Sequence, residues 1–161
     1  MKKVILFILV FAIFFSCNRN VISSEFREIS NAGWHKDSVF SFDFCVSDTL
    51  STYEIVVMVR NTDDFPRQNL WLGIELGKDN RTLSVDTMEF FLSDDYGRWR
   101  GRDAKWHGSA GSYFDNDFIY KQNVTFYKSG EYTYNLRHIM RFEKLKGMKY
   151  IGLKILKEKR R

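Results

Sequence analysis

Apolar and polar residues alternate with a period of two along most of the chain after residue 39. This period places alternate side chains on opposite faces of a β-strand. The same stretches are rich in β-branched and aromatic residues, which favour strands. We therefore expect about eight strands and almost no helix. The segments with the clearest pattern are residues 40–46, 53–60, 70–76, 84–92, 123–127, 131–138 and 149–156.

Turn-forming residues separate these segments. Residues 47–48, 61–66, 77–80 and 128–130 combine Asp, Asn, Gly, Ser and the single proline, and their spacing suits an antiparallel β-sandwich. An aromatic share of 17% suits two stacked sheets whose core is filled by Phe and Tyr. The predicted fold is all-β, an antiparallel β-sandwich of jelly-roll or Greek-key type. Residues 139–146 fit either a strand or one helical turn.

The first seventeen residues have the pattern of a secretion signal that ends on a cysteine. Lys2 and Lys3 precede an apolar run over residues 4–15, too short for a membrane-spanning helix. Ser16 and Cys17 resemble the lipobox of bacterial lipoproteins, in which the cysteine carries the lipid and becomes the new N-terminus. Phe14 stands where such a motif usually has Leu. The alternative is a plain secreted protein cut by the ordinary signal peptidase.

This processing divides the chain into four expected parts. Residues 1–16 are the signal peptide, 17–32 the lipidated Cys17 and a short tether, 33–158 one sandwich domain, and 159–161 a basic tail. About 145 residues follow the signal (161 less 16), enough for one domain with a real core. Several acyl chains would anchor the protein stably without spanning the membrane.

The net charge argues against nucleic acid as a partner. The chain has 25 Lys and Arg against 20 Asp and Glu, a net charge of +5, and loss of Lys2 and Lys3 leaves 23 against 20, or +3. Much of this excess lies in Lys154, Lys157 and residues 159–161. We interpret these residues first as a solvated tail and second as a patch that touches anionic lipid headgroups.

Nothing in the sequence has the spacing of a catalytic, metal or cofactor site. With Cys17 lipidated, only Cys45 remains, so no intramolecular disulfide can form. We expect Cys45 to be buried, on the face opposite Phe42 and Phe44. His35, His107 and His138 are scattered, and HExxH, GxSxG, CxxC and phosphate-loop motifs are absent. The sequence therefore predicts a protein that is not an enzyme and uses no metal or cofactor.

Residues 93–112 form the best candidate for a binding loop. This stretch combines glycines with aromatic and basic side chains, a composition typical of interaction loops on a β scaffold. The candidate partner or ligand residues are Arg98, Trp99, Arg100, Arg102, Trp106 and His107. Alternatively, both tryptophans fold inward and cap the sandwich. Asp94 and Asp95 are interpreted as turn formers that bind nearby amides.

Three Asp-Ser/Thr-apolar triplets match the pattern at which many Bacteroidetes glycosylate exported proteins. They are residues 37–39, 48–50 and 86–88. The triplet Asp48-Thr49-Leu50 lies in an expected turn, so Thr49 is the candidate O-glycosylation site.

A set of short motifs follows one order along nearly the whole chain. They are Cys17, Trp34, Arg60-Asn61, Phe65-Pro66, Asn69-Leu70, Asp86-Thr87, Leu92-Ser93-Asp94, Gly97-Arg98-Trp99, Gly101, Met140-Arg141, Leu145, Gly147, Gly152, Leu153 and Ile155. In this order they resemble the GldH family of gliding-motility lipoproteins of the Bacteroidetes. Residues 102–107 are more charged than the corresponding loop of that family.

The resemblance implies an outer-membrane-associated lipoprotein that serves gliding and linked protein secretion without catalysis. Its expected partners are other envelope or gliding-machinery proteins, together with the membrane that holds its anchor. The family also occurs in bacteria that do not glide. Residues 18–20 carry no acidic cluster, which favours the periplasmic face of the outer membrane. The alternative function is carbohydrate binding through exposed tryptophans.

Overall fold

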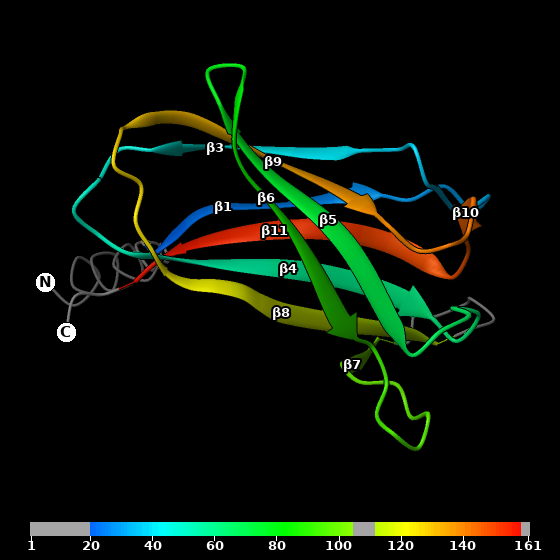
Figure 1. Ribbon diagram of the computed structural model, residues 1–161. Coiled ribbons are helices and arrows are strands. Elements are labelled where there is room, and N and C mark those ends of the chain that lie inside the picture. The colour runs from blue at the N-terminus through cyan, green and yellow to red at the C-terminus, as the bar shows by residue number, and fades with distance from the viewer. Residues whose placement is uncertain (1–19, 105–111, 159–161) are drawn as a thin grey trace, which may run out of the picture.

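Every regular element in the described part of the chain is a β-strand (Figure 1). The computed structural model describes residues 20–104 and 112–158. Within them, no helix is long and apolar enough to cross a membrane. The strands are β1 (Val21–Glu28), β2 (Trp34–His35), β3 (Phe40–Val46), β4 (Tyr53–Thr62), β5 (Asn69–Lys78), β6 (Arg81–Phe91), β7 (Arg102–Ala104), β8 (Tyr113–Val124), β9 (Gly130–His138), β10 (Lys144–Leu145) and β11 (Met148–Lys157).

Two antiparallel sheets form a sandwich, as the alternation predicts. One sheet has the order β1-β11-β4-β8-β7 and the other the order β3-β9-β5-β6, while β2 and β10 pair separately. Figure 1 shows the four-stranded sheet lying across the five-stranded one. Of the eleven strands in the described residues, eight have seven residues or more. This number agrees with the expected eight.

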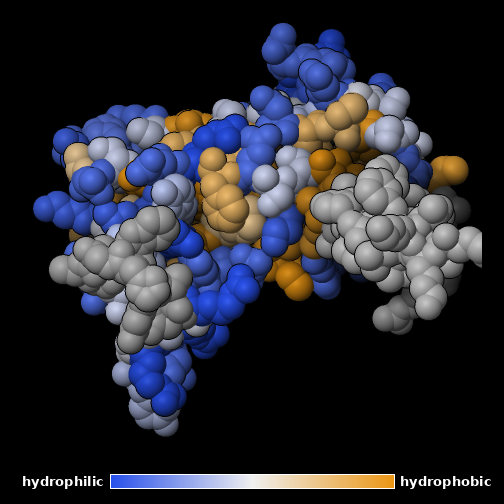
Figure 2. Space-filling view, turned by 180° about the vertical axis from the view of Figure 1, so that it is seen from behind, coloured by the Kyte–Doolittle hydropathy of each residue, from blue (hydrophilic) through white to orange (hydrophobic). Residues whose placement is uncertain are grey.

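The core lies between the facing sides of the two sheets. Val57 and Val59 of β4 and Ile151 of β11 supply one side and are almost completely buried. On the other side the ring of Phe44 stacks at 5.8 Å on Tyr132 and at 5.7 Å on Tyr134. The period-two pattern thus marks the inner face, and aromatic side chains fill the space between the sheets. Figure 2 shows the outer face of the five-stranded sheet, where hydrophilic side chains surround small hydrophobic areas.

Part of the segment that we expected to be a tether forms strand β1. We expected residues 17–32 to lead into the domain, whereas Val21–Glu28 pairs with β11 from Val21↔Leu156 to Glu28↔Tyr150. Its polar side chains suit an edge strand with one solvated face, which weakens the sequence signal. Residues 18–20 are all that separates Cys17 from the sheet.

Strand β8 also differs from the expectation. We expected a strand at residues 123–127, but β8 runs over Tyr113–Val124 and a loop follows it. Residues 113–122 directly follow the glycine-rich stretch, whose composition hid the strand start. The ambiguous residues 139–146 contain the short strand β10 and no helical turn.

Cys45 is exposed, so the expectation of a buried thiol is wrong. Phe42 and Phe44 of β3 point into the core, and the alternation places Cys45 on the opposite face, as expected. That face of β3 is solvated, since Ser41 and Asp43, which share it with Cys45, are exposed as well.

The strand register defines two ends of the sandwich. At the N-terminal end, Val21, Tyr53, Val124 and Leu156 come together, with Val21 opposite Leu156 and Tyr53 opposite Val124. At the distal end, Thr62 lies opposite Tyr113. Since β4 has 10 residues, the ends are about 30 Å apart along this strand. Loops 47–52 and 125–129 belong to the N-terminal end, and loops 63–68 and 92–101 to the distal end.

Candidate functional site

The candidate loop lies at the distal end and joins the two sheets. Residues 92–101 run from the end of β6 in the four-stranded sheet to β7 at the edge of the five-stranded sheet. The loop therefore lies away from residue 20, the first that the structure describes. Trp106 and His107, two of the expected site residues, lie outside the described residues.

Asp94 organises the loop, as its interpretation as a turn former predicts. Its carboxylate accepts hydrogen bonds from the backbone N–H groups of Tyr96 at 3.0 Å and Arg98 at 2.9 Å. It also accepts one from Nε of Arg98 at 2.8 Å. The backbone and side-chain N–H donors of Arg98 and the N–H of Tyr96 hold the pKa of Asp94 below its usual value, against the opposing effect of burial. The tip of the loop is thus a small, ordered turn.

Gly101 allows the loop to approach β8 closely. Its φ of +92° is in the left-handed region, and a Cβ there would lie 2.3 Å from the carbonyl oxygen of Asp115. Only glycine fits both constraints. The backbone N–H of Arg100 donates to the carbonyl of Leu92 at 2.7 Å, which closes the base of the loop.

Trp99 is half-buried and packs toward the core. Its ring meets Phe65 edge-on at a centroid distance of 6.3 Å and is tilted on Phe114 at 5.8 Å. The indole thus caps the sandwich, as the inward alternative predicts. The part of the ring that stays accessible forms a wall of a neighbouring hollow.

This distal hollow has a volume of about 480 Å³. Its lining residues are Phe65, Pro66, Arg67, Gln68, Asn69, Phe91, Ser93, Gly97 and Trp99. Arg98, Arg100 and Arg102 lie along the same loop and are exposed. The hollow thus has an apolar wall and the basic Arg67 in its lining, and three exposed arginines lie in the adjoining segment, a chemistry suited to an acidic partner with an apolar anchor residue.

Residues 65–69 are the part of the site that the binding-loop composition did not indicate. Residues 65–68 belong to the connection between β4 and β5 and Asn69 begins β5, all far from residues 93–112 in sequence. The backbone N–H of Leu92 donates to the carbonyl of Gln68 at 2.7 Å, which joins the two loops. The available signal was Phe65-Pro66 and Asn69 among the motifs of the family resemblance.

The two histidines in the part of the chain that the structure describes have different surroundings. His138 is buried, and its Nε2 donates to the carbonyl of Trp34 at 3.0 Å. Burial lowers the pKa of His138. His35 lies on the surface, 3.6 Å from Asp37 and 3.7 Å from Glu143. Across residues 20–104 and 112–158, no three His, Cys, Asp or Glu side chains are placed to hold a metal ion.

The tryptophans that the structure describes do not form a common stacking platform. Trp34 is buried, and Trp71 is partly exposed on the outer side of β5. Trp99 instead packs against Phe65 and Phe114 at the end of the core. A sugar-binding surface would need coplanar, exposed rings, and these three side chains face different surroundings.

Two predicted modification sites fall in different regions. Cys17 lies outside the described residues. Thr49 is half-buried in the 47–52 loop at the N-terminal end. Its neighbour Asp48 accepts hydrogen bonds from the N–H of Leu50 and the hydroxyl of Ser51. Both modifications remain predictions.

Comparison with known proteins gives one family for almost the entire described chain. The profile of the GldH lipoprotein family matches residues 21–155. The chain belongs to the GldH lipoprotein family. The matched range begins at β1 and includes all but the last two residues of β11, so it covers the whole sandwich.

Two GldH relatives have nearly the same length as this chain. The gliding motility lipoprotein GldH homolog of Christiangramia forsetii is 28% identical, over 96% of this chain and 95% of its own. The gliding motility lipoprotein GldH of Flavobacterium johnsoniae is also 28% identical, over 88% of this chain and 87% of its own. A comparison of structures finds the infectious bursal disease virus VP2 subviral particle, with a TM-score of 0.36 and 9% identity, covering 84% of this chain and 32% of that one.

Proposed function

We propose that this GldH protein is a non-enzymatic lipoprotein of the gliding-motility and linked protein-secretion machinery. In this proposal Cys17 carries the lipid and holds the sandwich at the periplasmic face of the outer membrane. The domain acts by docking onto other envelope proteins. The observation that carries the proposal is the match of the whole sandwich to the GldH family, whose relatives bear the name gliding motility lipoprotein.

The division between the two ends supports docking. Residue 20 belongs to the N-terminal end, since its carbonyl accepts a hydrogen bond from the N–H of Lys157 at 2.6 Å. The 92–101 loop lies at the distal end, about 30 Å away along a 10-residue strand. An anchor at one end thus leaves the other end open to protein partners.

The distal hollow indicates what kind of partner fits. Trp99 contributes to its apolar wall and Arg67 is the basic residue of its lining, while Arg100 and Arg102 follow Trp99 in the sequence and are exposed. We propose that the partner is an envelope protein with an acidic surface around one apolar side chain. Aromatic and Arg residues commonly dominate such interfaces, and complementary charge gives specificity and speed of association.

Cross-linking in the native envelope, followed by mass spectrometry, tests this function. We expect wild-type protein to capture envelope proteins and the double variant Arg100→Glu/Arg102→Glu to lose them. The matched control is Lys36→Glu/Lys144→Glu, which reverses two exposed charges at the β2–β10 pair and should keep the captured set. Circular dichroism and thermal unfolding check that all variants fold.

Two results would contradict the proposal. If the wild-type protein captures no envelope protein, docking is ruled out as the function. Equal capture by both double variants would remove the distal loop as the docking site. Separately, Cys17→Ser should abolish incorporation of labelled fatty acid and release the protein from the membrane fraction, and retention of the label would contradict lipidation at Cys17.

A further inference from the structure

The N-terminal end exposes apolar side chains next to basic ones. Tyr127, in the loop between β8 and β9, is 89% exposed, and Leu50, in the loop between β3 and β4, is 78% exposed. Lys128 follows Tyr127 and is exposed as well. Tyr at the boundary between headgroups and acyl chains, with Lys beside it, is the composition of membrane-interface surfaces.

The length of the tether brings this end close to the membrane. Asn20 is fixed to β11, because its carbonyl accepts a hydrogen bond from the N–H of Lys157 at 2.6 Å. Only three residue steps separate Asn20 from Cys17. Three fully extended residues span at most about 10 Å. A lipid on Cys17 therefore holds the N-terminal end within contact distance of the headgroups.

Two acidic groups of this end, Asp48 and Glu158, are already engaged within the protein. Asp48 lies 2.6 Å from Nζ of Lys157. The ion pair with Lys157, with further hydrogen bonds from Ser51 and Leu50, keeps the pKa of Asp48 far below its usual value. Glu158 accepts hydrogen bonds from the hydroxyl of Thr52 at 2.6 Å and the N–H of Asn123 at 3.1 Å.

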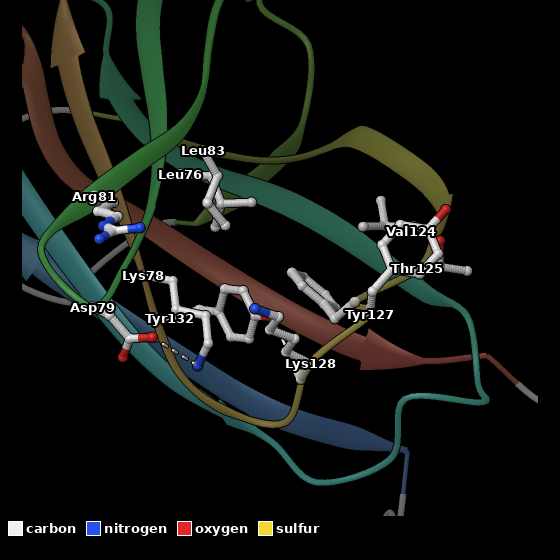
Figure 3. Close-up of a pocket in the computed structure, with 11 residues that line it drawn as sticks. Leu76, Lys78, Asp79, Arg81, Leu83, Val124, Thr125, Tyr127, Lys128 and Tyr132 are labelled. Atoms are coloured by element: carbon white, nitrogen blue, oxygen red, sulfur yellow. Dashed lines mark hydrogen bonds and ion pairs between the residues drawn. The ribbon is translucent and has the colours of Figure 1, made fainter.

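A hollow beside Tyr127 has the same amphipathic character (Figure 3). It has a volume of about 600 Å³ and lies between the β5–β6 hairpin and the 125–129 loop. Leu76 and Leu83 line one part, and the basic side chains Lys78, Arg81 and Lys128 line another, with Asp79 the acidic residue among the lining. Lys78 is held in place, because Nζ donates to the carbonyl of Ser129 at 3.1 Å and lies 4.6 Å from the ring centre of Tyr132.

We propose that the N-terminal end of the sandwich rests on the lipid surface that holds the anchor. Tyr127 and Leu50 enter the headgroup region, while Lys128 and Arg81 lie at the lipid phosphates. This inference rests on the proposed anchorage through Cys17. Contact of the N-terminal end with lipid orients the domain so that its distal loop points away from the bilayer. A domain held only by its tether would instead have no fixed orientation.

Lipid-borne quenching at two labelled sites tests this orientation. Full-length lipidated protein in the Cys45→Ser background is placed in vesicles of phosphatidylethanolamine and phosphatidylglycerol with a headgroup nitroxide. One variant carries a fluorophore at Ser129→Cys, beside Tyr127, and the matched control carries it at Asp95→Cys in the distal loop. Both native side chains are exposed. We expect severalfold stronger quenching at position 129 than at position 95.

A charge reversal separates true contact from mere tethering. Arg81→Glu/Lys128→Glu should weaken quenching at position 129, while Lys36→Glu/Lys144→Glu should leave it unchanged. Flotation of the vesicles reports the anchor independently. Protein that floats but shows equal quenching at both positions overturns the resting surface and leaves anchorage standing. Quenching that both double variants leave unchanged also overturns it, and protein that does not float removes the anchorage and this inference together.

Discussion

Arg60 of β4 and Asp115 of β8 face each other on the outer side of the five-stranded sheet and are joined at two points. Nε of Arg60 lies 2.6 Å from Oδ1 of Asp115, and Nη2 lies 2.7 Å from Oδ2. The ring centres of Tyr113 and Tyr150 lie 5.9 and 5.3 Å from the guanidinium carbon. The pair thus connects two central strands near the distal end. Asp115 also restricts position 101 to glycine, because a Cβ there would collide with the Asp115 carbonyl.

The two-point geometry predicts that lysine cannot replace Arg60. Arg60→Lys keeps the charge but loses one hydrogen bond and the planar contact with the tyrosine rings. We expect the free energy of unfolding to fall by about 0.5–1.5 kcal/mol, since the pair is half-buried and solvent screens part of it. Urea denaturation measures this change. The control Arg141→Lys, at an exposed residue, should change stability less, and equal losses would contradict the role of geometry.

Gly101→Ala should disturb the distal loop more than Gly97→Ala. Both residues have a positive φ, +92° and +77°, so both variants strain the backbone. At Gly101 a Cβ also collides with the Asp115 carbonyl, whereas the nearest atom at Gly97 is 4.0 Å away on the Gln68 side chain. We expect Gly101→Ala to lower the free energy of unfolding by about 2–4 kcal/mol and Gly97→Ala by about 1 kcal/mol.

Thermal or urea unfolding of the two glycine variants gives the comparison, and partner capture in the envelope gives the functional result. Gly101→Ala should lose partner capture together with loop order. A Gly101→Ala protein as stable as Gly97→Ala would show that the loop moves away from β8 at little cost.

The sequence predicts those parts of the fold that follow from strand period, and misses those that depend on the partner strand. Phe42 and Phe44 could be placed inside because both alternate with polar residues that face solvent. Cys45 was misjudged because alternation gives the face of a residue but not whether another layer covers it. Likewise β1 has few apolar residues and so lacks the alternation that indicates a strand. Its strand conformation follows from its pairing with β11.

The candidate site shows the same limit. Residues 93–102 were recognisable from glycine, Trp and Arg in one stretch, and Asp94 from its turn chemistry. The opposite wall of the distal hollow comes from the 63–68 loop, and tertiary contacts bring the two loops together: hydrogen bonds from Leu92 and Ser93 to Gln68 and the ring contact of Phe65 with Trp99. No local sequence pattern indicates that these two loops contact each other.

Burial of His138 predicts a loss of stability in mildly acidic solution. Its pKa is lowered in the folded protein because burial disfavours the imidazolium, with His35 adding repulsion. Between the lowered pKa and the unfolded value of 6.5, the unfolded chain binds more protons. The free energy of unfolding should therefore be highest above about pH 6.5 and fall as the pH drops through that value.

Urea denaturation from about pH 7.5 to about pH 5 measures this slope, a range in which carboxylates such as Asp94 remain ionised. His138→Gln keeps a donor for the Trp34 carbonyl but cannot titrate, so its stability curve should lose most of the slope. The control His35→Gln, at the surface histidine, should keep most of the slope. A wild-type slope unchanged in His138→Gln would assign the pH dependence to another group.

Two predictions for the turn at Asp48, Thr49 and Leu50 exclude each other. The sequence motif predicts a glycan on Thr49, whereas contact of Leu50 with lipid leaves no room for one. Contact with lipid requires an unmodified Thr49, which is half-buried beside an Asp48 that is bound to Lys157, Ser51 and the N–H of Leu50. The intact mass of mature protein from its own host, compared with Thr49→Ala, decides between them. A glycan mass that Thr49→Ala removes would establish the modification and move the N-terminal end away from the lipid surface.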